Sequence, residues 1–379
     1  MKNIKKSIII FILLFIPFII SGCNRENVLL ILNWGEYIND EIVTNFEKEY
    51  NCEVKISIAD SNELFYAKVK SGTTAYDLVV PSDYMIQKMY EKDLLQKLDF
   101  SQIPNYDKNS FLPGVRGIMS EMFEGNENYH IPYFWGTFGL MYNKQVEGLE
   151  EVIQENGWDA YFNSSLLPSG TRVAMYNVPR YAFAATMFYH HMSPNIISDE
   201  TLQLFETSLR EANIIEWGND TLKKGIVANN LDLAFVYTGD YLDMLYTKLD
   251  EGASFEDITF DIYIPEETIA FVDSLVMPKN SRHKGLAYKF MNYMLEKENA
   301  YLNASVVGYC TPLIASYDMI ANPTDLNDNW LVNWSKAIKQ YYPLPAPTGK
   351  QYIGTPLSNI SKDDLTKINN IVNKIKTSS

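Results

Sequence analysis

Apolar runs in the first part of the chain follow the pattern of strands. The run VLLIL at 28–32 is wholly apolar and predicts a buried strand. The segment EVKISI at 53–58 alternates with a period of two, as a half-buried strand does. A third strand is predicted for YDLVV at 76–80, where Pro81 ends it.

Amphipathic stretches between these runs predict helices. Asp40 is expected to cap a helix that turns Ile42 and Phe46 inward. A second helix is predicted from 62 to 70 and is closed by Gly72. Ser82 or Asp83 is expected to cap the next helix.

The same alternation continues along the chain and predicts an α/β fold. A βαβα order implies a mostly parallel sheet with helices on both faces, and so many elements imply two lobes. Further strands are predicted near 138–143, 171–176, 232–237, 260–264 and 272–277, and further helices at about 180–191, 200–212, 240–249 and 284–296. In open α/β sheets ligands bind beyond the carboxyl ends of strands, so the loops there are the candidate site.

Four of these strand-end loops combine aromatic side chains with carboxylates. They are NWGEY (33–37), PSDY (81–84), YTGD (237–240) and AFVDS (270–274). Taken singly, such an aromatic usually packs in the core, and an Asp after Gly usually caps a turn. Their recurrence at equivalent positions of the predicted topology indicates one shared binding site.

The combination suits an alkyl diamine. An ammonium group has three donors and no acceptor, so carboxylates must receive it. Aromatic faces cover the methylenes and add cation–π attraction at each end. A sugar site would also use aromatic rings, but it would rarely need so many acids without basic partners.

The N-terminus indicates export. Lys2, Lys5 and Lys6 precede an apolar run at 7–20, which is too short to span a bilayer and predicts a signal peptide. The run ends in ISGC, which resembles the bacterial lipobox, with Cys23 as the lipid-modified residue. We therefore expect a lipoprotein on the outer face of the cytoplasmic membrane or in the periplasm. A plain signal peptide and an N-terminal membrane helix are the alternatives.

Charge and cysteine content limit the possible partners. Without residues 1–22 the chain has 29 basic and 47 acidic residues, a net charge of −18, which argues against nucleic acid and suits cations or simply solubility. Cys52 and Cys310 are expected to be buried thiols, although a disulfide is possible in this compartment. No metal-binding or nucleotide-binding motif is present, and His190-His191 fits a helix flank, so no cofactor and no metal are expected.

From about residue 29 to 320 the sequence resembles the spermidine/putrescine-binding proteins of bacterial ABC importers. The matching motifs are NWGEY (33–37), SNELFYAKVKSG (61–72), YDLVVPSDYMIQKM (76–89), IPYFWGTFGLMYN (131–143), DSLVMPKNS (273–281) and GYCTP (308–312). The resemblance implies a periplasmic-binding-protein fold of type II that closes over its ligand without changing it chemically. It also implies delivery to the permease subunits of an importer, and a monomer is expected.

The resemblance also implies a division of the chain. Residues 1–22 are the signal peptide and 23–28 a lipidated linker. The N-terminal lobe is expected at 29–133 plus 274–320, and the C-terminal lobe at 134–273 plus 321–379.

Functional positions carry over residue by residue. Glu36 and Asp273 match amine-contacting acids, and Ser82 matches a Ser of the second loop. The aromatic matches are Trp34, Tyr37, Tyr84, Tyr237, Phe271 and Tyr309, and Gln351 matches a C-terminal Gln.

Two departures from the family pattern predict a diamine. After the strand RVAMY the family has two acids that can reach the amines. This chain has NVPRY at 177–181, which places Tyr181 in the pocket wall instead. Conversely, Asp240 resembles the acid of putrescine-preferring relatives. Putrescine is therefore expected to bind in preference to spermidine, held by Glu36, Asp240 and Asp273.

The sequence is also compatible with other functions. The same scaffold can hold a different cationic or polar solute, and Tyr341-Tyr342 is the kind of pair that ferric-ion binders use, although packing accounts for it better. An enzyme using two acids and a surface adhesin are further alternatives. None of these carries a motif of its own.

Overall fold

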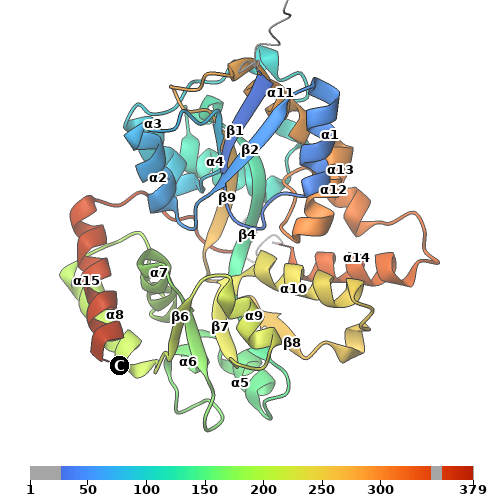
Figure 1. Cartoon of the computed structure of the whole chain (residues 1–379). Helices are drawn as coiled ribbons and strands as arrows, with labels where there is room; N and C mark the ends of the chain where they lie inside the picture. The colour runs from blue at the N-terminus through green and yellow to red at the C-terminus, as the bar shows by residue number, and fades with distance from the viewer. Residues whose placement is uncertain (1–26, 343–351, 379) are drawn as a thin grey trace, which may run out of the picture.

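The computed structural model describes residues 27–342 and 352–378. Two lobes lie one above the other, and a mixed sheet passes through both (Figure 1). The strands of the described residues are β1 (Val28–Asn33), β2 (Glu53–Ile58), β3 (Leu78–Val79), β4 (His130–Asn143), β5 (Val173–Tyr176), β6 (Glu216–Gly218), β7 (Leu233–Tyr237), β8 (Phe260–Tyr263) and β9 (Ala270–Val276). Their order is β2-β1-β3-β9-β4-β7-β5-β6, and β8 pairs with β4.

Strand β4 joins the two lobes. Its first half pairs antiparallel with β9, and its second half pairs antiparallel with β7 and β8. Every residue of β4 is buried. The register with β9 shifts between Pro132 and Phe134, since proline has no N–H to donate to the ladder. The parallel pairings lie toward the outer parts of the sheet, where β1 pairs with β2 and β3, and β5 pairs with β6 and β7.

Helices cover both faces of this sheet (Figure 1). Those of the upper lobe lie around β1–β3 and β9, and those of the lower lobe lie around β5–β8. The α-helices of the described residues are α1 (Asp40–Tyr50), α2 (Asn62–Ser71), α3 (Asp83–Glu91), α4 (Pro113–Phe123), α5 (Leu149–Asn156), α6 (Trp158–Phe162), α7 (Pro179–Tyr189), α8 (Asp199–Glu211), α9 (Thr221–Val227), α10 (Thr238–Asp250), α11 (Lys284–Met294), α12 (Lys297–Val307), α13 (Ile314–Ala321), α14 (Asn329–Tyr341) and α15 (Lys362–Ser378). The predicted two-lobed α/β fold is thus confirmed.

Several local predictions need correction. The strand predicted at 138–143 begins earlier, at His130. Asn39, not Asp40, caps α1: its side chain accepts a hydrogen bond from the Glu41 backbone, and Asp40 is the first helical residue. The third strand is shorter than predicted and comprises only Leu78 and Val79. Helix α2 ends as expected at Gly72, whose φ of 63° lies in the left-handed region that glycine tolerates.

Ser82 is the N-cap residue of α3, but its side chain forms no capping hydrogen bond. Its hydroxyl instead accepts a hydrogen bond from the Asn62 side-chain amide at 3.0 Å. Asp83 lies one position later and is buried. One of its carboxylate oxygens accepts a hydrogen bond from the Val272 backbone at 3.2 Å, which ties α3 to β9.

Both cysteines of the described residues are free thiols. Cys310 is buried as predicted, whereas Cys52 is only partly buried. The predicted signal peptide, Cys23 and Gln351 lie outside the described residues. Among the helices at 27–342 and 352–378, none combines the length and apolarity that a membrane span requires.

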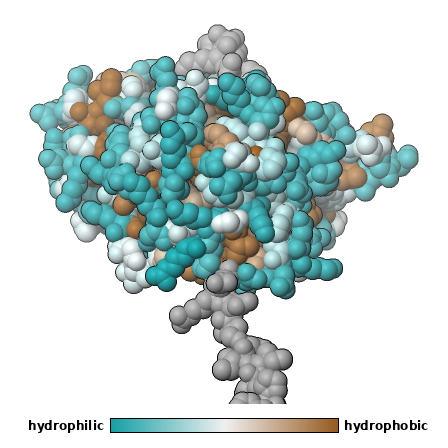
Figure 2. Space-filling model, turned by 90° about the horizontal axis from the view of Figure 1, so that it is seen from above, coloured by the Kyte–Doolittle hydropathy of each residue, from teal (hydrophilic) through white to brown (hydrophobic). Residues whose placement is uncertain are grey.

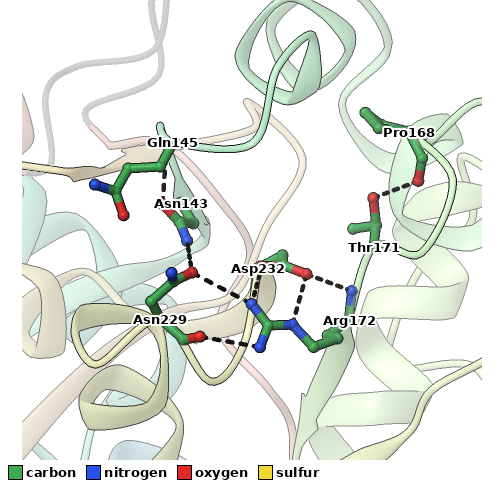
Figure 3. A network of polar contacts seen from close by, with 7 residues as sticks. All are labelled: Asn143, Gln145, Pro168, Thr171, Arg172, Asn229 and Asp232. Atoms are coloured by element: carbon green, nitrogen blue, oxygen red, sulfur yellow. Dashed lines mark hydrogen bonds and ion pairs between the residues drawn. The ribbon is translucent and has the colours of Figure 1, made fainter.

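The face seen from above is mostly hydrophilic, with hydrophobic residues in small separate patches (Figure 2). On the lower lobe, a polar network ties together the amino ends of the parallel strands β5 and β7 (Figure 3). Arg172, just before β5, bonds to Asp232, just before β7, through its backbone N–H at 2.7 Å and its guanidinium at 2.5 and 2.9 Å. The guanidinium also donates to the Asn229 carbonyl at 2.9 Å.

Candidate ligand-binding site

A cavity of about 260 Å³ lies between the segments that follow β1, β2, β6 and β7, the last residue of β5 and the middle of β9. This volume is somewhat below the range typical of drug-sized ligands, so the cavity suits a small molecule. The residues around it are Trp34, Gly35, Glu36, Tyr37, Ile58, Ala59, Asp60, Tyr176, Asn219, Asp220, Thr221, Lys223, Tyr237, Asp240, Asp273, Val307 and Tyr309. It therefore brings together seven of the predicted site residues: Trp34, Glu36, Tyr37, Tyr237, Asp240, Asp273 and Tyr309.

Asp273 is one of two buried carboxylates of this cavity. It is 5% exposed, and the Tyr37 hydroxyl donates to its Oδ2 at 2.7 Å. Its Oδ1 has no hydrogen-bond partner among the described residues. Burial raises the pKa of Asp273 to about 6, although the Ser82 and Tyr37 hydroxyls lower it in part. Ser82 faces Asp273 across an antiparallel bridge, which brings its hydroxyl near the carboxylate.

Asp240 is the second buried carboxylate. It lies in the first turn of α10, and the Tyr309 hydroxyl donates to its Oδ1 at 3.0 Å. Its Oδ2 likewise has no hydrogen-bond partner in the described part of the chain. Burial raises the pKa of Asp240 to about 6, and the nearby Lys223 opposes this shift. Both acids therefore lack part of the hydrogen bonding that a buried carboxylate normally has.

Aromatic rings connect the two carboxylates. Tyr37, bonded to Asp273, and Tyr309, bonded to Asp240, meet edge to face with their ring centroids 4.7 Å apart. Gly239 permits this approach, because a Cβ there would lie only 2.6 Å from the Tyr309 ring. The result is an apolar wall with an acid at each end.

Two further aromatic residues complete this wall. Tyr237 lies at the carboxyl end of β7 and meets Tyr176, at the end of β5, with ring centroids 5.3 Å apart. The Tyr237 hydroxyl donates to the Tyr181 hydroxyl at 2.9 Å. Because β5 and β7 run parallel, their carboxyl ends bring these rings to the same side of the cavity.

The loop after β1 holds Trp34 and Glu36 differently. The Trp34 indole donates to the Val80 carbonyl at 2.8 Å and packs against Phe65, which fixes the ring. Glu36 has a φ of 52°, a left-handed conformation that is uncommon for a residue with a side chain. Its carboxylate is 57% exposed and pairs with Lys224 at 3.1 Å and with Lys223 at 3.6 Å. These two ion pairs lower the pKa of Glu36, with the Lys224 hydrogen bond as the largest cause.

The remaining predicted residues lie beside this cavity, around a much smaller one of about 10 Å³. Tyr237 lines both cavities. The predicted site residues around the smaller cavity alone are Ser82, Tyr84, Tyr181 and Phe271. They are buried and pack behind the main cavity, so in this conformation they support its wall.

Sequence reasoning missed several residues of the cavity. Tyr176 is the last residue of a predicted strand, so the strand-end rule could have found it. Asn219, Asp220 and Lys223 follow the short strand β6, which was not predicted because only three residues form it. Asn219 is notable because its side-chain oxygen is buried and has no partner in the described residues.

No group of His, Cys, Asp and Glu residues within 27–342 and 352–378 has the arrangement of a metal site. Tyr341 and Tyr342 do not act as a pair. The Tyr341 hydroxyl bonds to Asp261 at 2.5 Å, whereas the Tyr342 hydroxyl contacts the Tyr309 carbonyl at 3.5 Å. Both rings are buried in the core.

The molecule has two lobes joined by crossing strands and a small polar and aromatic cavity at strand ends. These features are typical of a two-lobed protein that binds a small solute. A family model for bacterial extracellular solute-binding proteins matches residues 32–301. The chain belongs to this family. Its relatives are solute-binding proteins of ABC transporters and not enzymes, in agreement with the sequence prediction.

Individual relatives confirm the family resemblance drawn from the motifs. The spermidine/putrescine-binding periplasmic protein of Escherichia coli K12 is 26% identical over 324 residues, which cover 84% of this chain and 87% of that protein. The putrescine-binding periplasmic protein PotF of the same strain is 28% identical over 310 residues, covering 77% and 81%. A putative spermidine/putrescine ABC transporter protein from Listeria monocytogenes superposes with a TM-score of 0.75 at 28% identity, covering 93% of this chain and all of that one.

Proposed function

We propose that this protein is the extracytoplasmic polyamine-binding component of a bacterial ABC importer and that it prefers putrescine to spermidine. One observation carries the proposal. Asp240 and Asp273 line the same aromatic-walled cavity, and each has a buried carboxylate oxygen without a partner. Two such acceptors match the two ammonium groups of a diamine. Each ammonium group carries positively charged N–H donors, which a neutral sugar and an anion lack.

The energetics favour a diamine of this kind. A buried carboxylate without a counter-charge is costly, and a ligand ammonium relieves that cost at each end. The four methylenes of putrescine lie between the charges, and their burial against Tyr37 and Tyr309 contributes about 3 kcal/mol at ~0.8 kcal/mol per CH₂. Cation–π attraction to the same rings adds about 0.5–2 kcal/mol for each ammonium.

The preference for putrescine rests on which acids are present. Tyr181 stands where family members have an acid that can reach an amine, and its hydroxyl is bonded to Tyr237. Asp240 is the acid that putrescine-preferring relatives carry. Relatives named for putrescine alone and for spermidine with putrescine match this chain about equally well, so identity does not decide between them.

Calorimetric titration of the purified protein tests the proposal with matched ligands. Putrescine is expected to bind, and spermidine to bind at least tenfold more weakly. 4-Aminobutanoate also has four carbons but carries a carboxylate in place of one terminal CH₂–NH₃⁺ group, and it should bind at least a hundredfold more weakly than putrescine, because its carboxylate would face Asp240 or Asp273. Tighter binding of spermidine would reverse the preference, and binding of 4-aminobutanoate or a neutral sugar in place of both polyamines would overturn the polyamine assignment.

The wider assembly follows from the same proposal. The lobes at 29–133 plus 274–320 and at 134–273 plus 321–379 close over the ligand and deliver it to the permease subunits. Lipid on Cys23 holds the protein at the outer face of the cytoplasmic membrane. A Cys23→Ser variant should therefore lose covalently attached lipid, measured by incorporation of labelled fatty acid in cells; labelling of the variant would argue against lipid on Cys23.

A further inference from the structure

Lys223 introduces a positive charge of the protein itself into the cavity. It lies in α9, it lines the cavity, and its side chain is only 4% exposed. Its ammonium lies 2.7 Å from Asp243, 3.5 Å from Asp240 and 3.6 Å from Glu36. Fully buried lysines are rare, because burial of an unpaired ammonium group costs much free energy. The three carboxylates around Lys223 offset this cost.

These contacts fix the charge state of Lys223. Burial by itself would lower the pKa of this ammonium, but Asp240 and Asp243 outweigh burial and raise it well above its ordinary value. Lys223 is therefore protonated at neutral pH. Its ammonium donates a hydrogen bond to Asp243 and forms longer ion pairs with Asp240 and Glu36, so its charge is balanced by acids of the protein.

The consequence concerns the acids of the cavity. Glu36 pairs with Lys223 and Lys224, so its charge is already balanced. Asp240 shares Lys223 but keeps one unpartnered oxygen, and Asp273 has no basic partner among the described residues. Asp60 and Asp220 also line the cavity, but Asp60 is exposed and Asp220 is only partly buried, so an ion pair formed at either is more strongly screened by water. Only two buried carboxylates remain able to receive ligand ammonium groups.

We propose that Lys223 is a specificity-determining residue: its ammonium occupies the position of a third ligand ammonium and thereby restricts the cavity to diamines. A triamine such as spermidine would have to bring its third charge beside Lys223 or leave it at the exposed rim. This inference rests on the proposed polyamine function and deepens it. Lys223 follows the unpredicted strand β6, and none of the motifs shared with the polyamine-binding family includes it.

The test compares the affinities of putrescine and spermidine, measured by calorimetry, for Lys223→Met and Lys224→Met. Lys224 is the matched control, because it pairs with the same Glu36 but is 54% exposed and does not line the cavity. In Lys223→Met the ratio of spermidine to putrescine affinity should rise at least tenfold, because Glu36 and Asp243 become available to a third ammonium. In Lys224→Met the ratio should stay within about twofold of that of the original protein.

A second variant guards against misfolding of Lys223→Met, which leaves carboxylates without their counter-charge. Lys223→Gln combined with Asp243→Asn replaces the 2.7 Å ion pair by a pair of amides, and a rise in the affinity ratio is again expected, smaller than in Lys223→Met because only Glu36 becomes available. An unchanged ratio in the folded variant would overturn the role of Lys223 while leaving polyamine binding intact. Failure of the original protein to bind either polyamine would instead overturn the proposed function itself.

Discussion

Strand β7 has a buried aspartate at each end, and the two are in opposite states. Asp232, before the strand, is met by the backbone and guanidinium of Arg172 (Figure 3). Burial raises the pKa of Asp232, but the bonds from Arg172 outweigh burial and lower it overall. Asp240, beyond the strand, keeps an oxygen without a partner, and burial raises its pKa to about 6.

This difference separates a structural acid from an acid that we propose to bind the ligand. Both residues are nearly inaccessible, so burial alone does not distinguish them. What distinguishes them is whether the protein supplies all the donors. The Asp232 carboxylate receives three hydrogen bonds from Arg172 and positions β5 against β7, whereas Asp240 and Asp273 each keep an oxygen without a donor among the described residues. Unmet hydrogen-bonding capacity in a cavity is thus the more informative sign of function.

The largest expected effect is on binding by Asp273→Asn. The amide retains an acceptor for the Tyr37 hydroxyl but cannot neutralise an ammonium. Putrescine affinity should fall by at least a hundredfold, since removing one member of a buried ion pair costs about 3–5 kcal/mol. The ligand-free variant should not be less stable than the original protein. The pKa of Asp273 is about 6 in the folded protein and about 3.9 in the unfolded chain, so its ionised carboxylate destabilises the fold at neutral pH. Calorimetry measures the affinity, and thermal unfolding measures the stability. Normal putrescine binding by the variant would show that Asp273 is not a ligand-binding residue.

Acidification should weaken binding through the same two groups. Asp240 and Asp273 both have a pKa of about 6, so each is ionised at pH 7.5 and mostly protonated at pH 5. A dication needs both ionised forms, and each protonation costs about tenfold over this range, or ~1.4 kcal/mol. Titrations at both pH values should therefore differ by up to about a hundredfold. A pH-independent affinity would contradict the assignment of these carboxylates as the ammonium ligands.

The structural acid should respond in the opposite way. Asp232→Asn breaks the charge-assisted bonds from Arg172, whose guanidinium is 38% exposed and therefore partly screened. We expect a loss of about 1–2 kcal/mol in the free energy of unfolding, with putrescine affinity unchanged within about twofold. Denaturant unfolding at pH 7 measures the loss. The loss should shrink toward low pH, because a lowered pKa stabilises the fold only where the carboxylate is ionised.

The smallest effect is expected for Tyr309→Phe. This change removes the hydrogen bond from the Tyr309 hydroxyl to Asp240 at 3.0 Å but keeps the ring that forms the wall. One hydrogen bond to a charged group contributes about 1.5 kcal/mol, so putrescine affinity should change by about tenfold or less. A change as large as that of Asp273→Asn would show that the ring position, and not the hydroxyl alone, had been lost.

Local patterns made much of the fold predictable. The strands at 28–32 and 53–58 and the helix that ends at Gly72 follow from periodicity and capping residues, which act over a few positions. Strand β6 was missed because three residues carry no periodic signal. The loop NWGEY and Asp240 were found because they follow recognisable strands. Asp273 was expected in a loop at a strand end, but AFVDS (270–274) lies within strand β9, so this part of the prediction was wrong.

The state of each acid was not predictable in this way. Glu36 was expected to bind an ammonium of the ligand, yet the structure surrounds it with Lys223 and Lys224, which lie far away in the sequence. The sequence also offered no sign that the acids of the cavity would have basic partners. Asp273 and Tyr37 are likewise far apart in the chain and meet only after the lobes are assembled.

The sequence by itself determined the two-lobed α/β fold, the family and the kinds of side chain at the strand ends. Periodicity, capping and motif spacing depend on residues that are close together in the sequence. Only the tertiary structure decided which carboxylates are already neutralised and which remain open. The physical reason is that ion pairing depends on distances of a few ångströms and on exclusion of water. Both arise when α9, β7 and β9 pack around one cavity.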